Sequence, residues 1–362
     1  MQPSVGLIGA GNIGRFHSRS LYNVLRMGLI DARYVAACDR TVERAEEFAR
    51  LAHLEFVTED ADALINHPDV NTVYVCTPTV EHKELVRKAA GAGKHIFCEK
   101  PLARTLEDAR EMYDIVRNAG VRHQVGLVLR HSPIFTVLKE LMSDPRLGRL
   151  MTIIFRDDQF FPIQGHYASD WRKDYAVTGG GTLIEHSIHD IDLLTWLAGD
   201  VESLRAETRN FAGHTQVEDL ATVTMRFADG ATAQLVSIWH NVLSRPSTRL
   251  LEVFFENGYF ALDQDFLGDI RYATYATDNG RIAQDEVLSR YLAIVGLEGE
   301  AYERATAGYS LEDYFFLRAI SEGRDPFPGF DVAVRAHELV DAVYRSAADG
   351  GAPVSCPTGT GS

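Results

Sequence analysis

The stretch Gly9-Ala10-Gly11-Asn12-Ile13-Gly14 decides the fold of this chain. It follows an apolar run and opens a segment in which hydrophobic residues recur at helical spacing. In such a strand-to-helix turn, the first glycine permits the tight turn, the second lets the backbone approach a pyrophosphate, and the third allows close helix packing. The phosphates would meet the N–H groups of the helix N-terminus. The stretch therefore predicts a dinucleotide-binding turn, with Gly9, Gly11, Asn12 and Ile13 next to the cofactor.

Residues 1–125 alternate short apolar runs with helical patterns, which is typical of a parallel sheet with crossover helices. The runs are nearly continuous in apolar residues, as expected for strands covered on both faces. We therefore predict an N-terminal Rossmann domain over residues 1–125. Its expected strands are Val5–Gly9, Tyr34–Asp39, Thr72–Cys76, His95–Cys98 and Gln124–Leu129.

The ends of these strands carry candidate cofactor contacts. Asp39 ends the second strand, where a carboxylate can accept hydrogen bonds from ribose hydroxyls and would repel a 2′-phosphate, which favours NAD. Arg40 follows at once and could accommodate that phosphate, so NADP is an alternative. Thr77 and Pro78 follow the third strand, and His82 could either cap the next helix at the surface or contact the cofactor.

A second motif, Glu99-Lys100-Pro101, closes the fourth strand. Because carboxyl ends of parallel strands meet at one edge of the sheet, this tripeptide brings Lys100 to the reactive end of a dinucleotide. A lysine beside an oxidised nicotinamide would have a lowered pKa, which suits proton transfer. The two motifs together predict a nicotinamide-dependent enzyme acting on an alcohol or a carbonyl.

Residues 126–348 show a different pattern and are expected to form an α+β domain with a large, mostly antiparallel open sheet. A helix is expected over Phe135–Met142 and a strand over Leu150–Arg156, followed by an irregular segment over residues 157–178. Strict alternation in Leu220–Phe227 and Thr232–Ile238, joined at Asp229-Gly230, predicts a hairpin. Residues 349–362 are small, polar and glycine-rich and are expected to form a flexible tail.

The glycine run at residues 179–181 precedes a predicted helix that carries candidate acid–base groups. On that helix Glu185, His189 and Asp192 fall at i, i+4 and i+7 and share one face. A carboxylate one turn before a histidine can fix the imidazole tautomer and stabilise its cation, which prepares it for proton transfer. Metal binding by His186, His189 and Asp190 is an alternative, but no further ligand of clear spacing accompanies them, and we predict no metal.

Composition disfavours several classes of function. The net charge of −15 disfavours nucleic acid and anionic membranes as partners. No apolar run approaches the ~20 residues that span a bilayer, and the N-terminus lacks a signal-peptide layout. Cys38, Cys76 and Cys98 lie near strand ends and Cys356 lies in the tail, a distribution that favours reduced, buried thiols. We expect a cytoplasmic enzyme with a small-molecule substrate.

In this order, the glycine turn, Glu99-Lys100-Pro101 and the helix with Glu185 and His189 resemble the Gfo/Idh/MocA family, the group of glucose–fructose oxidoreductase and inositol dehydrogenase. The resemblance covers nearly the whole chain, up to a helix at Asp331–Ser346, and the Glu-Lys-Pro motif is its more specific part. It implies a Rossmann domain followed by an α/β domain whose open sheet often serves dimer or tetramer contacts. It also implies a peptide bond before Pro101 that is often cis.

The resemblance further implies roles for individual residues. Lys100 matches the family's motif lysine next to the nicotinamide and the reacting oxygen, and His189 matches its catalytic histidine. Glu185 stands where the family usually has an aspartate. The implied reaction is hydride exchange between a substrate carbon and nicotinamide C4. His189 would take or return the hydroxyl proton, and Lys100 would polarise the same oxygen or relay the proton itself.

Aromatic and polar side chains in the second domain suit a sugar, polyol or cyclitol as substrate. The candidate contacts are Arg130, Asp157, His166, Tyr167, Trp171, Arg172, His186, His189, Trp239 and His240. An alternative is an NAD-dependent glycoside hydrolase that oxidises the sugar transiently, eliminates the leaving group, adds water and reduces the product again. His186 or Tyr167 could supply the additional base that this reaction needs. A sensor without chemistry is disfavoured because both Lys100 and His189 are present.

Overall fold

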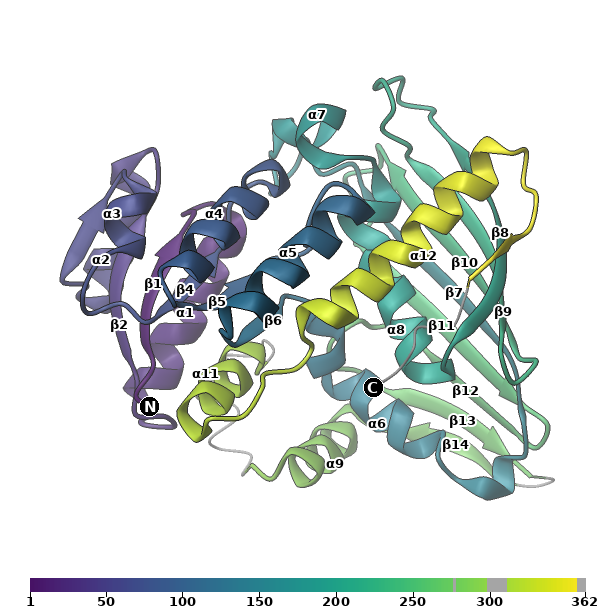
Figure 1. The fold of residues 1–362 in the computed structure, drawn as a ribbon. Coiled ribbons are helices and arrows are strands. Elements are labelled where there is room, and N and C mark those ends of the chain that lie inside the picture. Colours follow the sequence, from purple (N-terminus) through teal and green to yellow (C-terminus); the bar gives the residue numbers. More distant parts are fainter. Residues whose placement is uncertain (276–277, 298–310, 357–362) are drawn as a thin grey trace. The chain divides into compact units, whose positions relative to one another are not determined.

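In this computed structural model the described residues are 1–275, 278–297 and 311–356. The chain divides into two compact units. The first contains Met1–Leu127 and Leu297–Val334, and the second contains Val128–Gly296 and Arg335–Ser362. Most of their helices and strands are labelled in Figure 1.

The first unit is built on a six-stranded sheet in the order β3-β2-β1-β4-β5-β6, with every neighbouring pair parallel. This is the strand order of the Rossmann fold. The predicted strands are present, but the last one is shorter than expected, because residues Val128–His131 form a 3₁₀ turn after it. The strands are β1 (Ser4–Ile8), β2 (Arg33–Cys38), β3 (Phe56–Thr58), β4 (Thr72–Val75), β5 (His95–Cys98) and β6 (His123–Val125).

Helices cover both faces of this sheet, as the continuous apolar strands require. One hydrophobic cluster includes residues of the helices α4 (Thr79–Gly91) and α5 (Leu106–Ala119). The other includes residues of α1 (Asn12–Arg26), α2 (Val42–Ala52) and α11 (Glu312–Glu322). A short helix, α3 (Ala61–Ile65), follows β3.

Helix α11 returns to the first unit from late in the chain, which differs from the domain boundaries that the sequence pattern suggested. Phe316, Leu317 and Ile320 are buried in one cluster with Leu7 and Leu21 of the Rossmann core. Their helical spacing indicates an amphipathic helix but does not indicate which core that helix joins. The segment 311–334 therefore belongs to the Rossmann unit by its packing.

The second unit is built on a nine-stranded sheet in the order β14-β13-β12-β11-β7-β10-β9-β8-β15. All pairs are antiparallel except β7 with β10, which is parallel. The strands are β7 (Leu150–Phe160), β8 (Val201–Arg209), β9 (Leu220–Phe227), β10 (Thr232–His240), β11 (Thr248–Phe255), β12 (Gly258–Leu262), β13 (Ile270–Thr274), β14 (Asp278–Ile282) and β15 (Val354–Ser355).

Two expectations for this unit need correction. Strand β7 continues to Phe160 rather than ending at Arg156, because it pairs along its length with both β10 and β11. The expected tail is held in place through Cys356, since β15 pairs with β8 and the Cys356 N–H donates to the carbonyl of Glu202. The last residues, 357–362, lie outside the described part of the chain.

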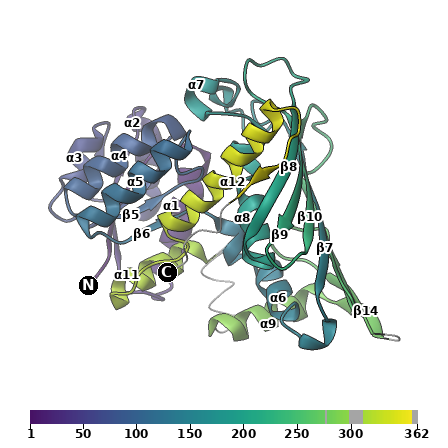
Figure 2. The same cartoon turned by 45° about the vertical axis from the view of Figure 1, so that its right-hand side comes forward.

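Among the described residues, helices lie on one face of the nine-stranded sheet and leave the other face open (Figure 2). Burial alternates strictly along β9, β10 and β11, which is the pattern of a sheet with one covered face. The helices are α6 (Pro133–Leu141), α7 (Tyr175–Thr178), α8 (Ile188–Ala198), α9 (Gln284–Val295) and the part of α12 (Phe330–Ala348) that follows Val334.

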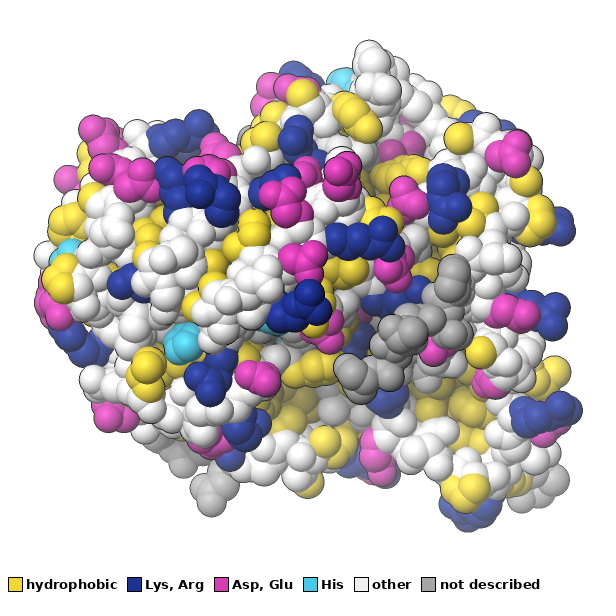
Figure 3. All heavy atoms as spheres, viewed as in Figure 1, with side chains coloured by type: hydrophobic (Ala, Val, Ile, Leu, Met, Phe, Trp, Pro, Cys, Tyr) yellow, Lys and Arg dark blue, Asp and Glu magenta, His cyan; other side chains and the backbone are white. Residues whose placement is uncertain are grey.

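Charged side chains of both signs lie close together on the surface of α4 and α5 (Figure 3). Lys83 pairs with Asp108 at 2.7 Å, and Lys88 pairs with Asp62 at 2.7 Å. This part of the surface is therefore mixed in charge rather than basic. Among the described residues, every helix is too short or too polar to cross a lipid bilayer.

Candidate active site

Of the three motif glycines in the turn between β1 and α1, Gly11 is the one that leaves open space on the side where a side chain would lie. A Cβ atom on Gly9, whose φ is +100°, would lie 2.6 Å from the Cys76 carbonyl oxygen, and one on Gly14 would lie 1.9 Å from the Gly9 oxygen. A Cβ on Gly11 would meet nothing within 4 Å. Asn12 and Ile13 are exposed at the start of α1, and the N-cap Gly11 supplies no side-chain cap. The helix N-terminus can therefore receive a pyrophosphate.

Asp39 lies beside this turn, at the end of β2. Its carboxylate accepts hydrogen bonds from the N–H groups of Ala10, at 2.7 Å, and Thr41, at 2.8 Å, which fix its orientation. The Arg40 side chain is 81% exposed and pairs with Glu81 at 3.3 Å. The fixed carboxylate fits the ribose hydroxyls of NAD.

The ends of β4 and β5 form the other half of this edge. The Oγ1 atom of Thr77 is buried and has no hydrogen-bond partner in the described part of the chain. The Lys100–Pro101 peptide bond is cis, as the family resemblance implies. A buried hydroxyl without a protein partner next to the glycine turn is consistent with a bound ligand.

His82 is not the surface cap that was one of its two predicted roles. It is buried, with Nε2 2.9 Å from the carbonyl oxygen of Thr77 and Nδ1 3.1 Å from that of Pro101. His82 therefore joins the end of β4 to the Glu99-Lys100-Pro101 turn. Its predicted contact with the cofactor stays a prediction.

In the second unit, the glycine run before α8 packs against Glu218. A Cβ on Gly181 would lie 1.8 Å from the Glu218 carbonyl oxygen. The Glu218 carboxylate accepts the N–H groups of Gly181 (2.8 Å) and Leu183 (2.9 Å) and the hydroxyl of Tyr344 (3.0 Å). Glu218 therefore fixes the start of the segment that carries the predicted acid–base residues.

That segment begins with a π-helical turn, Leu183–Ser187, which continues directly into α8. Such turns occur frequently at functional sites. Glu185 and His189 are both buried. The Glu185 carboxylate accepts a hydrogen bond from Nε of Arg172 at 3.3 Å, and the Arg172 guanidinium lies over the Trp171 ring. The structure thus places the predicted site residues Trp171, Arg172 and Glu185 next to one another. The support of His189 by Glu185 stays a prediction.

Arg249 on β11 is the buried centre of a charged cluster that the sequence did not predict. Its guanidinium binds Asp157 (3.1 Å), Asp190 (2.9 Å) and Asp265 (2.8 Å). His186 lies at this cluster, with Nε2 2.8 Å from the Asp157 carboxylate. Burial and the nearby Asp157 carboxylate raise the pKa of Asp190 to about 7, against the opposing effect of Arg249.

Several residues that were predicted to contact the substrate have partners within the second unit. Asp157 is buried against Arg249, and Arg130 forms a two-pronged ion pair with Asp192 at 2.7 and 2.8 Å. His166 and Tyr167 pack beside each other, with ring centroids 4.1 Å apart. Trp239 is buried in a small cluster, and His240 lies 3.6 Å from Asp158. Direct contact of these residues with a substrate stays a prediction.

Three residues of these clusters were not identified from the sequence: Arg249, Glu218 and His17. For Arg249 and His17, the hydrophobic pattern of the surrounding element does indicate a buried position. Arg249 occupies an inward position of an alternating strand, in line with Leu251 and Val253. His17 lies on the apolar face of α1, four residues before Leu21. A charged or titratable residue at a core position requires a buried partner, which local spacing does not identify.

A Rossmann sheet with a glycine turn, a fixed Asp39 carboxylate and the Glu99-Lys100-Pro101 turn along one edge is the arrangement of a nicotinamide-dependent oxidoreductase. Comparison with known proteins agrees. Residues 4–127 match the family model for the "oxidoreductase family, NAD-binding Rossmann fold", and residues 135–261 match the "GFO/IDH/MocA C-terminal domain".

Two relatives match along almost the whole chain. Levoglucosan dehydrogenase of Pseudarthrobacter phenanthrenivorans is 27% identical over 95% of this chain and 96% of its own. Inositol 2-dehydrogenase of Rhizobium meliloti is 29% identical over the same shares. A solved structure of levoglucosan dehydrogenase with NADH and levoglucosan has a TM-score of 0.84 and 25% identity, covering 99% of this chain and 100% of that one. The chain belongs to the Gfo/Idh/MocA family of NAD-binding oxidoreductases, which includes sugar and polyol dehydrogenases.

Proposed function

We propose that this protein is an NAD-dependent dehydrogenase of a sugar, polyol or cyclitol. The observation that carries the proposal is the single sheet edge on which an open Gly11, a fixed Asp39 carboxylate and the turn bearing Lys100 occur together. Relatives named levoglucosan dehydrogenase and inositol 2-dehydrogenase support the substrate class.

When bound, the cofactor would accept the hydride at nicotinamide C4 in its oxidised form, NAD⁺, or donate it in its reduced form, NADH. His189 takes or returns the proton of the reacting hydroxyl, and Glu185 supports its charged form. Lys100 donates a hydrogen bond to the same oxygen or relays the proton. These roles follow from the family resemblance together with the buried positions of Glu185 and His189.

The substrate contacts that we propose come from the aromatic and polar segment after β7 and from the π-helical turn. A sugar ring can stack on an aromatic face while its hydroxyls bond to polar side chains at the rim. The residues proposed for this are His166, Tyr167, Trp171, Arg172 and His186.

The test is absorbance at the reduced-nicotinamide band while the purified protein is given NAD, or NADP in parallel, with a panel of sugars, polyols, cyclitols and glycosides. Substrate-dependent formation of NADH supports the dehydrogenase and names its substrate class. Faster turnover with NADP would contradict the role given to Asp39. Glycoside cleavage without net NADH would replace the dehydrogenase by the redox-neutral hydrolase.

We also propose a cytoplasmic homodimer or homotetramer that uses the open face of the nine-stranded sheet. Ile154 is 43% exposed at the centre of this face. Val236 and Ile238 on β10 and Leu250 and Phe254 on β11 point to the same side by the alternation of burial. An open face with such residues fits a second copy of the chain.

Replacing Ile154 with arginine is expected to halve the mass of the oligomer, from dimer to monomer or from tetramer to dimer, because a like charge from each copy would face the other across the contact. Light scattering coupled to size exclusion measures the change. Leu51→Arg is the control, since Leu51 is 39% exposed on α2 of the other unit. An unchanged mass for Ile154→Arg would remove this face from the contact.

A further inference from the structure

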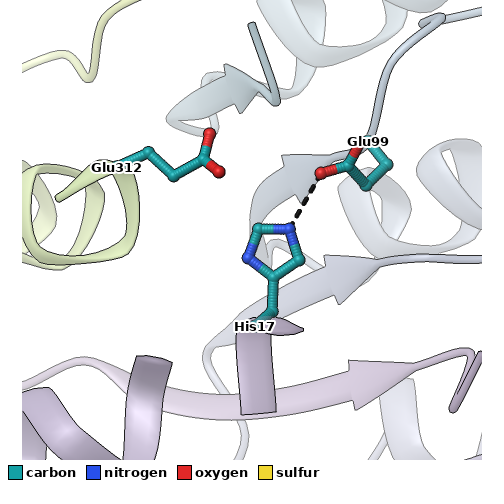
Figure 4. A group of neighbouring side chains, drawn as sticks. All are labelled: His17, Glu99 and Glu312. Carbon is teal, nitrogen blue, oxygen red and sulfur yellow. Dashed lines mark hydrogen bonds and ion pairs between the residues drawn. The ribbon is translucent and has the colours of Figure 1, made fainter. Parts of the chain in front are cut away.

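His17 lies at the centre of a buried charged cluster inside the Rossmann unit. Its side chain is fully buried on α1, with Nε2 2.8 Å from Oε1 of Glu99 and Nδ1 2.8 Å from Oδ1 of Asp313. Figure 4 shows the bond to Glu99 and, on the other side, the carboxyl group of Glu312. His17 thereby connects three elements: the cofactor-binding helix α1, the end of β5 and helix α11.

The contacts define the charge of the ring. Burial alone would lower the pKa of His17, but the carboxylates of Asp313 and Glu99 outweigh it and raise that pKa well above the usual range. Only the imidazolium can donate from both ring nitrogens. Burial also raises the pKa of Glu312 well above its usual range, opposed by His17 and reinforced by Glu99 and Asp313. The cluster therefore holds an imidazolium between Glu99 and Asp313, with the carboxyl group of Glu312 beside it.

Aromatic packing also holds the His17 ring in place, in addition to its two ion pairs. It packs against Phe97, with ring centroids 4.9 Å apart, and against Tyr74, at 5.6 Å. Asp313 is fully buried on α11, whose Phe316 contacts the same two aromatic rings at 5.5 Å. The position of the imidazolium is thus fixed by packing from α11 and from the sheet.

Glu99 connects the fixed imidazolium to the turn that bears Lys100. While Oε1 binds His17, Oε2 accepts the backbone N–H of Lys100 at 3.0 Å. The carboxylate also lies close to Gly126, where a Cβ would approach Oε1 to 2.6 Å. The hydrogen bond from the Lys100 backbone N–H to Glu99 therefore depends on where His17 holds the Glu99 carboxylate.

We propose that His17 is a positioning residue that, through Glu99, sets the backbone of Lys100 and hence the place of its amine. The inference rests on the proposed function in that it takes Lys100 to act in the reaction. An ion pair of this kind is a poor way to gain stability, because well-packed apolar residues of similar volume often stabilise a core as much or more. Leu21 and Val24 already continue the apolar face of α1. The specific direction of the two bonds is what the imidazolium adds.

Two variants separate the two bonds of the ring. In His17→Gln, the side-chain nitrogen occupies the place of Nε2 and can still donate to Glu99. In His17→Asn, the nitrogen occupies the place of Nδ1 and can donate only to Asp313. Because a displacement of about 1 Å can cost ~10²-fold in rate, we expect His17→Asn to lose about 10²-fold in kcat. We expect His17→Gln to lose at most about tenfold, with the NADH dissociation constant of both close to that of the wild type.

A double-mutant cycle with Lys100→Met shows whether the effect passes through the lysine. If His17 acts by positioning Lys100, His17→Asn adds little to the loss in the Lys100→Met background. Equal fold-losses in both backgrounds would overturn the inference and leave His17 a structural residue. Equal kcat values for the Gln and Asn variants would overturn it as well.

The cycle also distinguishes failure of the inference from failure of the proposed function. Full activity of Lys100→Met would overturn the proposed role of Lys100 and the inference with it. A large loss in Lys100→Met with an additive His17 effect overturns the inference alone. If His17→Asn does not fold, Asp313→Asn takes its place, because it loosens the ring from α11 and leaves Glu99 intact. A kcat loss that disappears in the Lys100→Met background supports the inference, and an additive loss overturns it.

Discussion

Replacing His189 with alanine is expected to lower kcat by about 10²–10⁴-fold, the usual contribution of a positioned acid–base group. His189 is buried on the first turn of α8, and Glu218 fixes the start of the segment that carries it. The segment that carries the imidazole is therefore positioned by the fold before a substrate arrives. Steady-state kinetics in both reaction directions, with the substrate that the panel identifies, measure the loss.

Two further measurements make this result specific. Added imidazole should restore part of the activity of His189→Ala, because the small molecule can take the place of the missing ring. His214→Ala, in the loop between β8 and β9, is the control and should keep wild-type kinetics. A kcat within tenfold of the wild type would move proton transfer from His189 to Lys100.

The fold was predictable from sequence wherever the hydrophobic pattern of a single segment identifies a helix or a strand. Strands β1 and β4 are continuous apolar runs because both sheet faces are covered, and the hairpin of β9 and β10 shows strict alternation around Asp229-Gly230. Strand β3 was missed, since three partly buried residues at a sheet edge give no period. Helix α11 has an apolar face like any other helix, so only the three-dimensional packing assigns it to the Rossmann core.

The candidate site divides in the same way. The glycine turn and Glu99-Lys100-Pro101 are contiguous motifs whose chemistry is visible in a single stretch of sequence. The bond between His17 and Asp313 joins residues 296 positions apart, and that between Arg249 and Asp157 joins residues 92 apart. Buried charges need partners, but sequence spacing carries no information on which distant residue supplies one. The residues that hold the site in place were therefore the ones that the sequence did not predict.

Replacing Lys100 with methionine is expected to lower kcat by about 10²–10⁴-fold, because the apolar side chain is of similar length but cannot donate to a reacting oxygen or move a proton. NADH affinity should change little. The glycine turn and the Asp39 carboxylate, with its bonds to Ala10 and Thr41, do not involve the lysine side chain. Stopped-flow absorbance gives the rate of hydride transfer, and fluorescence titration gives the dissociation constant of NADH.

Lys100→Arg distinguishes the two roles left open for the lysine. Arginine keeps a positive charge and several donors but does not give up its proton, so it can polarise an oxygen and cannot relay a proton. Retained activity in Lys100→Arg with none in Lys100→Met would assign hydrogen bonding to Lys100 and leave proton transfer to His189. Equal losses in both variants would favour Lys100 as the proton relay, and the His189→Ala loss should then be the smaller one. Wild-type turnover in Lys100→Met would exclude both roles.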